Sequence, residues 1–199
     1  MKKLTYPFDE RQIRSLRAGD AVSLTGLIYT GRDKFHKFFA DGGRMTVDFK
    51  DGALYHCGPV VVGTGPYRVM AAGPTTSVRE NPYEPDFIAR SGVRVIIGKG
   101  GMDAATLAAM KRCGCVYIQA VGGAAALSAA SVKRVAGVDF LEAFGAAEAC
   151  WHFEVEDFRG VVAMDAHGRS LFDEVRESSE RRLRELRSES QDRRIQKVI

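Results

Sequence analysis

The sequence predicts an α/β fold, a single domain built on one mixed sheet and followed by a C-terminal helical tail. Two consecutive units of strand, glycine-rich turn and helix between residues 93 and 130 predict a largely parallel sheet there. The length of 199 residues suits one domain with an appendage. The 21 glycines stand in short clusters between apolar runs, which indicates tight turns between regular elements.

The first half of the chain predicts short elements with short connections. Ala18-Gly19-Asp20 ends the first helix, and an alternating apolar pattern predicts the strand that follows. Two later strands each end at a Gly-Pro pair. The short connections favour antiparallel or mixed pairing in this part. The expected elements are a helix over residues 9–16, a strand over 21–29, a helix over 34–40, and strands over 54–57 and 67–72.

The second half predicts the parallel units and two late strands. The run 93–97 is β-rich and apolar, and Asp103 is placed to begin the helix after it. A turn over residues 165–168 predicts a hairpin at the end of the last strand. The expected elements are strands over residues 93–97 and 115–120, helices over 103–111 and 124–130, and strands over 153–156 and 161–165.

The charge is concentrated at the end of the chain. The net charge is +4, yet residues 176–199 hold eight basic and five acidic side chains, so the rest is close to neutral. A broad basic surface for a nucleic-acid backbone is therefore not expected. The interleaved charges of the tail indicate a solvated helix. We expect one domain over residues 1–175 and a charged helical or partly disordered tail over 176–199.

Composition also bears on cell compartment and on metal binding. No apolar run is long enough to span a membrane, and the N-terminus shows no secretory signal. Four cysteines are too few and too irregularly spaced for a disulfide framework or a zinc ribbon. We therefore expect a cytoplasmic, reduced protein without a metal site of its own, whose cysteines are small buried apolar residues.

The first candidate site is the turn at residues 98–102, with Lys99 among three glycines. A glycine-rich turn between a strand and a helix offers backbone N–H groups to an anion, and Lys99 adds a positive charge. The spacing fits neither a P-loop nor a dinucleotide fingerprint. The turn suits a small anion, although a tight turn with a solvated lysine explains it equally well.

The second candidate is the segment 73–79, which follows a strand. Thr75, Thr76 and Ser77 precede Arg79, so hydroxyl groups and a guanidinium stand close enough to hold a carboxylate. The alternative is an ordinary helix cap by Thr75 or Thr76 with an exposed arginine.

The third candidate is the segment 29–37. Arg32 follows a strand end, where ligands of α/β proteins usually bind. His36 lies one helical turn later and can face the same site, but a lone histidine is more often a packing residue. Three cationic loops at strand ends, without metal-ligand spacing, predict a site for a small polyanion such as a dicarboxylate. No serine-protease-type triad, zincin motif or paired catalytic carboxylates accompany them.

Six motifs together resemble one family, the β subunit of class I iron–sulfur hydro-lyases, which includes fumarate hydratase and L-tartrate dehydratase. They run in order from about Gly19 to Asp165. The motifs are GDAVSLTGLIYTGRDKFHK, YHCGPV, AAGPTTSVR, GVRVIIGKGGM, VGGAAAL and FEVEDF. The resemblance implies a swivelling β/β/α domain, which agrees with a single mixed sheet.

The resemblance also implies a partner and a cofactor. In the family the [4Fe-4S] cluster is held by cysteines of the α subunit, so this chain is expected to bind none itself and to work with an α subunit in a heterotetramer. The active site would lie between the subunits, and the β subunit alone would be inactive. The substrate would be a small dicarboxylate, with no nucleic acid and no membrane involved.

Residue roles follow from the same resemblance. Arg32, Arg79 and Lys99 would bind the substrate carboxylates. Thr75 would be the base at the substrate carbon, with Thr76 as a neighbouring ligand and Lys99 as a second catalytic group. A threonine hydroxyl is a weak base, so nearby cations would have to lower its pKa.

The motifs IYTGRD, VGGAAAL and FEVEDF favour fumarate hydratase, a tricarboxylic acid cycle enzyme, over L-tartrate dehydratase. Glu80 departs from the family, which commonly has methionine after the arginine of GPTTSxR. This carboxylate either points away from the anion site or alters substrate preference. The remaining alternative is a non-catalytic module that binds a small anion.

Overall fold

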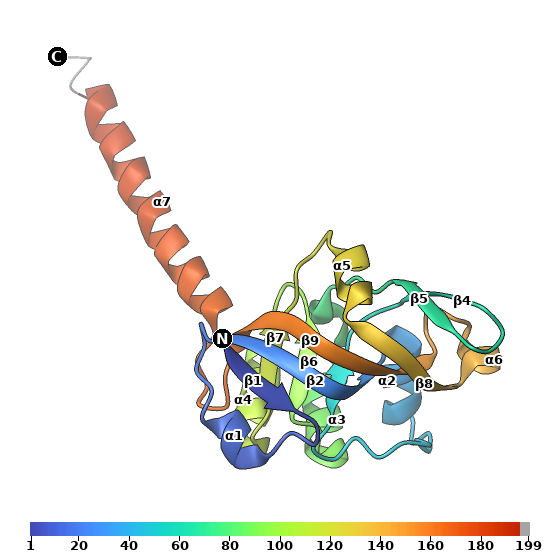
Figure 1. Cartoon of the computed structure of the whole chain (residues 1–199). Coiled ribbons are helices and arrows are strands. Elements are labelled where there is room, and N and C mark those ends of the chain that lie inside the picture. Colours follow the sequence, from blue (N-terminus) through green and yellow to red (C-terminus); the bar gives the residue numbers. More distant parts are fainter. Residues whose placement is uncertain (196–199) are drawn as a thin grey trace.

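The body of the molecule is a mixed sheet with helices packed around it, and one long helix projects from it (Figure 1). The computed structural model describes the backbone of residues 1–195 and the side chains of residues 1–188. The last four residues of the predicted tail, 196–199, lie outside the described residues.

Five strands close into a ring at the centre of the sheet. The first four are parallel neighbours in the order β2, β3, β6, β7. Strand β9 is antiparallel to both β7 and β2, and so joins the two ends of the series. The bounds are β2 Ala21–Thr30, β3 Ala53–Tyr55, β6 Val95–Gly98, β7 Val116–Gln119 and β9 Cys150–Met164.

Further strands extend the ring. Strand β1 (Lys2–Thr5) pairs in parallel with β2, and β8 (Val132–Asp139) pairs antiparallel with β9. Strands β4 (Val60–Val62) and β5 (Arg68–Ala71) form a separate antiparallel hairpin.

The helices connect the strands and cover them. Helices α2, α3 and α4 pack against one another in one layer, with α5 at the opposite end of the body (Figure 1). The bounds are α1 Glu10–Arg14, α2 Asp33–Ala40, η1 (a 3-10 helix) Ser77–Glu80, α3 Glu84–Ser91, α4 Ala104–Cys113, α5 Ala125–Ala130, α6 Leu141–Phe144 and α7 Leu171–Ile195.

Alternate residues of the short parallel strands enter two different apolar cores. In β3, Ala53 and Tyr55 belong to a core that draws on all five ring strands, whereas Leu54 belongs to a core shared with the helix layer. Ile97 and Ile96 of β6 divide in the same way. This period of two explains why the parallel strands are apolar at every position, since both of their faces are buried.

Local sequence signals account for the ends of helix α4. Asp103 is the N-cap, and its Oδ1 accepts hydrogen bonds from the Thr106 backbone N–H at 2.9 Å and the Thr106 hydroxyl at 2.8 Å. The helix ends at Gly114, whose φ of 69° lies in the left-handed region that glycine adopts freely. The helix expected to begin at Asp103 is thus confirmed.

The pairing in the first half of the chain is mixed, which is one of the two arrangements expected. Strand β2 is parallel to β1 and β3, because the chain crosses over through helices between them, whereas β4 and β5 are antiparallel. Other expectations about the strands were incomplete. The late strands expected at 153–156 and 161–165 are one 15-residue strand, β9. Strands β1 and β8 were not predicted, since both begin with charged or exposed residues at the margin of the sheet.

Helix α7 is the charged tail that the sequence predicts, and it is helical through residue 195. Its first turns contact β9, and the rest extends away from the body (Figure 1). None of the helices in the described part of the chain has the length and apolarity needed to cross a bilayer.

Candidate functional site

Two of the three predicted cationic residues lie at the carboxyl ends of parallel strands on either side of β3. Strand β2 ends at Thr30, two residues before Arg32, and β6 ends at Gly98, directly before Lys99. Strand β3 pairs with both. Since the carboxyl ends of parallel strands meet at one edge of a sheet, Arg32 and Lys99 belong to the same edge, where ligands of α/β proteins bind.

The segment 74–79 is tied to this edge by backbone hydrogen bonds. The Thr75 N–H donates to the His56 carbonyl at 2.6 Å, directly after β3. The Ser77 N–H donates to the Lys99 carbonyl at 3.0 Å, and the Lys99 N–H donates to the Thr75 carbonyl at 3.3 Å. The structure therefore brings the second candidate segment beside the first, with Thr76 paired to Lys99 in a parallel bridge.

The two arginines share a carboxylate. Asp33 Oδ2 lies 2.9 Å from Arg79 Nη2 and 3.8 Å from Arg32 Nη2. Arg32 Nε is also 3.4 Å from Glu148 Oε1. Asp33 thus forms ion pairs with both Arg32 and Arg79. A ligand carboxylate bound next to Asp33 would contact both guanidinium groups.

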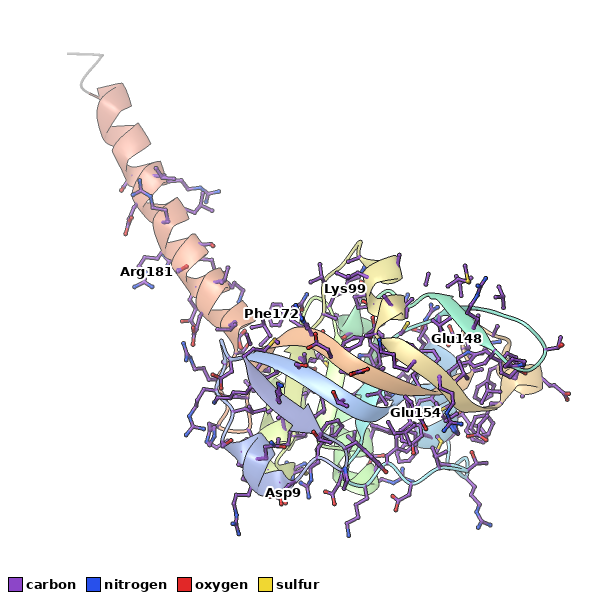
Figure 2. All side chains as sticks on the ribbon, viewed as in Figure 1. Asp9, Lys99, Glu148, Glu154, Phe172 and Arg181 are labelled. Carbon is purple, nitrogen blue, oxygen red and sulfur yellow. The ribbon has the colours of Figure 1, made fainter. Side chains whose placement is uncertain are left out.

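Two glycines lie beside the cationic side chains, and at Gly58 a larger residue would clash. A Cβ at Gly58 would lie 2.2 Å from Arg32 Nη1 and 2.8 Å from the Ala147 carbonyl oxygen, so the Arg32 side chain passes directly over Gly58. A Cβ at Gly122 would lie 3.5 Å from Lys99 Cδ. Lys99 is labelled at the edge of the body below α5 (Figure 2). We name the surface formed by Arg32, Asp33, Thr76, Arg79 and Lys99 the cation rim.

The threonines differ in exposure. Thr75 is half-buried, and Thr76 is exposed at the N-cap position of η1. The Thr76 side chain makes no capping hydrogen bond. The expected N-cap position is confirmed for Thr76, but its hydroxyl does not serve as the cap.

A second polar group, the buried cluster, lies within the same loops. It consists of His36, His56, Ser77, Glu84 and Tyr117, all with exposed fractions of 0%. Glu84 Oε2 is 3.2 Å from His56 Nε2 and 3.5 Å from His36 Nε2. The structure therefore places His36, the possible site residue, in the interior beneath the cation rim.

Burial controls the ionisation of this cluster. Desolvation lowers the pKa of His36 to about 4, so its imidazole is neutral at pH 7. Burial acts to raise the pKa of Glu84, but His36 and His56 together bring it below its ordinary value.

Glu80, which departs from the family motif, is also fully buried. Desolvation raises its pKa to about 7. The carboxyl group is therefore not an exposed charge added to the cation rim.

The cysteines do not fit an iron–sulfur cluster. Cluster ligation requires thiolates close together, whereas Cys57 lies in one core and Cys115 and Cys150 in the other. Burial raises the pKa of each of these three thiols, to about 12 at Cys57. Within the described residues, the side chains close enough to share a metal ion are His36, His56 and Glu84, which is not a cluster donor set.

Sequence reasoning missed the residues that support the site. His56 stands in the YHCGP motif, and Glu84 stands next to Pro85 at the start of a helix. Their positions in the sequence therefore do not indicate that their side chains are buried polar groups. Asp33 and Glu148 were also missed as partners of the arginines. The signal available was the Arg32-Asp33 pair itself, since a carboxylate beside a cationic loop invites an ion pair.

The fold and the cation rim define a class of protein: an α/β domain with cationic side chains gathered at the carboxyl edge of its sheet. Comparison with known proteins gives the family. The family model described as "Fumarase C-terminus" matches residues 3–175.

Three relatives illustrate the match. A Geobacillus stearothermophilus protein named fumarate hydratase class I is 47% identical over 92% of this chain, but the chain covers only 36% of that relative's length. A Methanocaldococcus jannaschii protein named L(+)-tartrate dehydratase subunit beta is 38% identical, over 92% of this chain and 98% of the relative. The Escherichia coli L(+)-tartrate dehydratase subunit beta is 33% identical, over 87% of this chain and 88% of the relative.

The chain therefore belongs to the fumarase C-terminal family, whose named members are hydro-lyases or their β subunits. The resemblance stated from the six motifs is confirmed.

Proposed function

We propose that this chain is the β subunit of a two-subunit class I fumarate hydratase, which adds water reversibly to fumarate to give L-malate. The observation that carries the proposal is the cation rim. Arg32, Arg79 and Lys99 come from three segments distant in sequence, and strand register and backbone hydrogen bonds bring these segments to one edge. A dicarboxylate has two anionic ends, and such a rim offers separated cations for both.

The arginines are the carboxylate ligands in this proposal. A guanidinium pairs with a carboxylate through two parallel hydrogen bonds, and Asp33 holds Arg79 and Arg32 near each other before the ligand arrives. Lys99 supplies a point charge from the glycine-rich turn after β6. Thr76 contributes its hydroxyl, which makes no capping hydrogen bond, as a further ligand.

Thr75 handles the proton. In the direction of dehydration, its deprotonated oxygen takes the proton from the substrate carbon next to a carboxylate, the hydroxyl group leaves the neighbouring carbon as hydroxide, and the double bond forms between them. The cluster of an α subunit would supply the Lewis acid that takes up this hydroxide. Negative charge builds on that carboxylate as the proton leaves, and Lys99 and the arginines stabilise it. In hydration the same proton returns to carbon.

The enzyme is completed by a second subunit. This chain's cysteines do not fit a [4Fe-4S] cluster, so we assign the cluster to an α subunit, in a heterotetramer whose active site includes the cation rim. Four free cysteines suit a reducing, cytoplasmic setting.

A second candidate function is the β subunit of L-tartrate dehydratase. The observation that favours it is the match to two relatives named as that subunit, which are 38% and 33% identical over 92% and 87% of this chain. Tartrate is also a dicarboxylate, so the same cation rim would bind it. A chain that binds a small anion without turnover is the third possibility.

The deciding experiment is anaerobic reconstitution of this chain with its α partner, followed by parallel assays of fumarate, L-tartrate and mesaconate. We expect turnover of fumarate to exceed that of the other two. Preferred turnover of L-tartrate would replace the first candidate with the second. Anion binding by this chain in the absence of any turnover would leave only the third candidate, a chain that binds a small anion without catalysing a reaction.

Matched variants test the site within that assay. Arg79→Ala and Lys99→Ala should each lower kcat/KM by at least 100-fold. Arg112→Ala and Lys111→Ala are the controls, because both side chains are exposed at the far end of α4. Near-normal turnover in Arg79→Ala and Lys99→Ala would remove the cation rim as the substrate site. Turnover by this chain alone would contradict the need for the α subunit.

A further inference from the structure

The buried cluster connects the segments that carry the cation rim. His36 lies one turn after Arg32 in α2, and its backbone N–H donates to the Arg32 carbonyl at 2.9 Å. His56 follows β3 and accepts the Thr75 N–H on its carbonyl at 2.6 Å. The side chains of both histidines face the same oxygen, Oε2 of Glu84.

From His56 the contacts continue to the second and third loops. His56 Nδ1 is 2.8 Å from Ser77 Oγ, and Ser77 Oγ is 2.9 Å from the Tyr117 hydroxyl. The Ser77 backbone N–H also donates to the Lys99 carbonyl at 3.0 Å. One continuous polar chain therefore runs from Glu84 to the glycine-rich turn that holds Lys99.

The polar atoms of this series of contacts are packed tightly against the backbone at Gly98. A Cβ at Gly98 would lie 2.0 Å from Ser77 Oγ, 2.9 Å from the Tyr117 hydroxyl and 3.3 Å from His56 Nδ1. These polar atoms thus pack directly on the backbone that leads into Lys99.

An ionised Glu84 beside His56 favours one direction for the hydrogen bonds of this chain of contacts, although the Glu84–His56 contact is not itself aligned as a hydrogen bond. A carboxylate only accepts, and Glu84 Oε2 lies 3.2 Å from His56 Nε2, so a proton on Nε2 is favoured and Nδ1 is left as an acceptor. The Ser77 hydroxyl then donates to Nδ1, and the Tyr117 hydroxyl donates to Ser77. The opposite tautomer of His56 would turn the Ser77 contact around.

We propose that Glu84 is a positioning residue, which sets the tautomer of His56 and thereby holds the 75–79 segment in its substrate-binding conformation. The proposal deepens the proposed function and rests on it for its effect on catalysis. The hydrogen-bond direction itself does not depend on that function. Glu84 does not touch substrate, since its side chain is fully buried.

The direct test is nitrogen-15 NMR of histidine side chains in the full chain. In the wild-type protein we expect the Nε2 signal of His56 to be that of a protonated nitrogen. Glu84→Gln replaces the obligatory acceptor by an amide that both donates and accepts, so the His56 signals should move toward a mixture of tautomers. Glu80→Gln is the matched control, because it replaces another fully buried carboxyl group which, within the described residues, makes no ion-pair contact with either histidine, whereas Glu84 contacts both, and it should leave the tautomer unchanged.

Kinetics of the reconstituted enzyme give the second measurement. Glu84→Gln should lower kcat/KM by about 10- to 100-fold, chiefly through KM, since misplaced ligands weaken substrate binding. Ser77→Ala interrupts the chain without touching Glu84, and it should raise KM while His56 keeps its tautomer. If Glu84→Gln does not fold, the wild-type spectrum and Ser77→Ala still decide the matter.

Three results would overturn the proposal. The first is a wild-type His56 protonated on Nδ1. The second is an equal kinetic effect of Glu84→Gln and Glu80→Gln. The third is a tightly bound stoichiometric metal ion whose removal by a chelator shifts both histidine signals, because His36, His56 and Glu84 would then be ligands. An enzyme without hydro-lyase activity would instead contradict the proposed function and leave the NMR result standing.

Discussion

The cation rim and the buried cluster are two polar regions on the same loops. They differ in how far their side chains are exposed to solvent. On the rim, Arg79 is about half exposed, and the charges of both arginines are shared with Asp33. In the cluster, Glu84 and both histidines are fully removed from water. Exposed ion pairs contribute little to stability, whereas buried polar groups are costly unless they are satisfied. We infer that the rim serves a ligand and that the cluster serves the geometry of the rim.

The largest expected effect on activity comes from removing the Arg32 side chain from the cation rim. Arg32→Ala should lower kcat/KM of the reconstituted enzyme by about 100- to 1000-fold, because a carboxylate loses a charge-assisted partner. Its free energy of unfolding should change by less than about 1 kcal/mol, since the ion pairs of Arg32 are partly exposed. Steady-state kinetics and urea unfolding measure the two quantities. A large loss of stability with little loss of activity would reverse the assignment of the two regions.

The next effect concerns stability and pH at Glu80. Its pKa is raised from 4.5 to about 7 in the folded state, so the folded chain binds more protons than the unfolded chain between these values. Stability should therefore fall as pH rises from 4.5 through 7, by roughly 3 kcal/mol in total. Glu80→Gln should remove this part of the slope while leaving substrate preference unchanged. Urea unfolding of both proteins across this pH range measures the difference, and parallel curves would contradict the prediction.

A smaller effect separates two glycines beside rim cations. Gly58→Ala should weaken dicarboxylate binding by about 10-fold, because the new methyl group would overlap Arg32 Nη1 and displace the guanidinium. Gly122→Ala is the matched control, since its methyl group would make ordinary van der Waals contact with Lys99. Calorimetric titration with a non-reactive dicarboxylate distinguishes the two. Equal affinities in both variants would show that the Arg32 position does not control binding.

The smallest effect is expected on helix α7, outside both regions. Arg182 and Glu185 form an exposed ion pair at 3.0 Å. Glu185→Gln should change the free energy of unfolding by less than about 0.5 kcal/mol and leave kcat/KM unaltered. Thermal unfolding and the hydration assay measure both. A loss of activity here would mean that the projecting helix takes part in the assembly of the enzyme.

The exposed part of the site could be predicted from the sequence, and the buried part could not. The cationic residues of the rim stand beside glycines or threonines at the ends of apolar runs, namely Arg32, Arg79 and Lys99. Such turns can be recognised from the local sequence alone. Strand pairing then places them at one edge. Their convergence also requires β2 to be parallel to β3 and β6, and the short connections in the first half of the chain did not predict this.

The buried cluster depends on packing between segments far apart in the chain. Glu84 follows a polar turn and precedes a proline, which is typical of an exposed helix start. Only the packing of α3 against α2 and the end of β3 makes it the hub between two histidines. The same limit explains the error over β9: two apolar stretches separated by polar residues look like two strands, and only its pairing with both β8 and β2 shows it to be continuous.

Strand β9 has a consequence for how the chain is made. Ser23 and Asp157, which are hydrogen bonded across the β2–β9 pair, are 134 residues apart in sequence. During synthesis, β2, β3, β6 and β7 therefore all leave the ribosome before the strand that closes the ring exists. Pairings of such long range are slow to form and leave strand edges uncovered meanwhile. The edges of β2 and β7 that await β9 are thus the part of the nascent chain in greatest need of protection from aggregation.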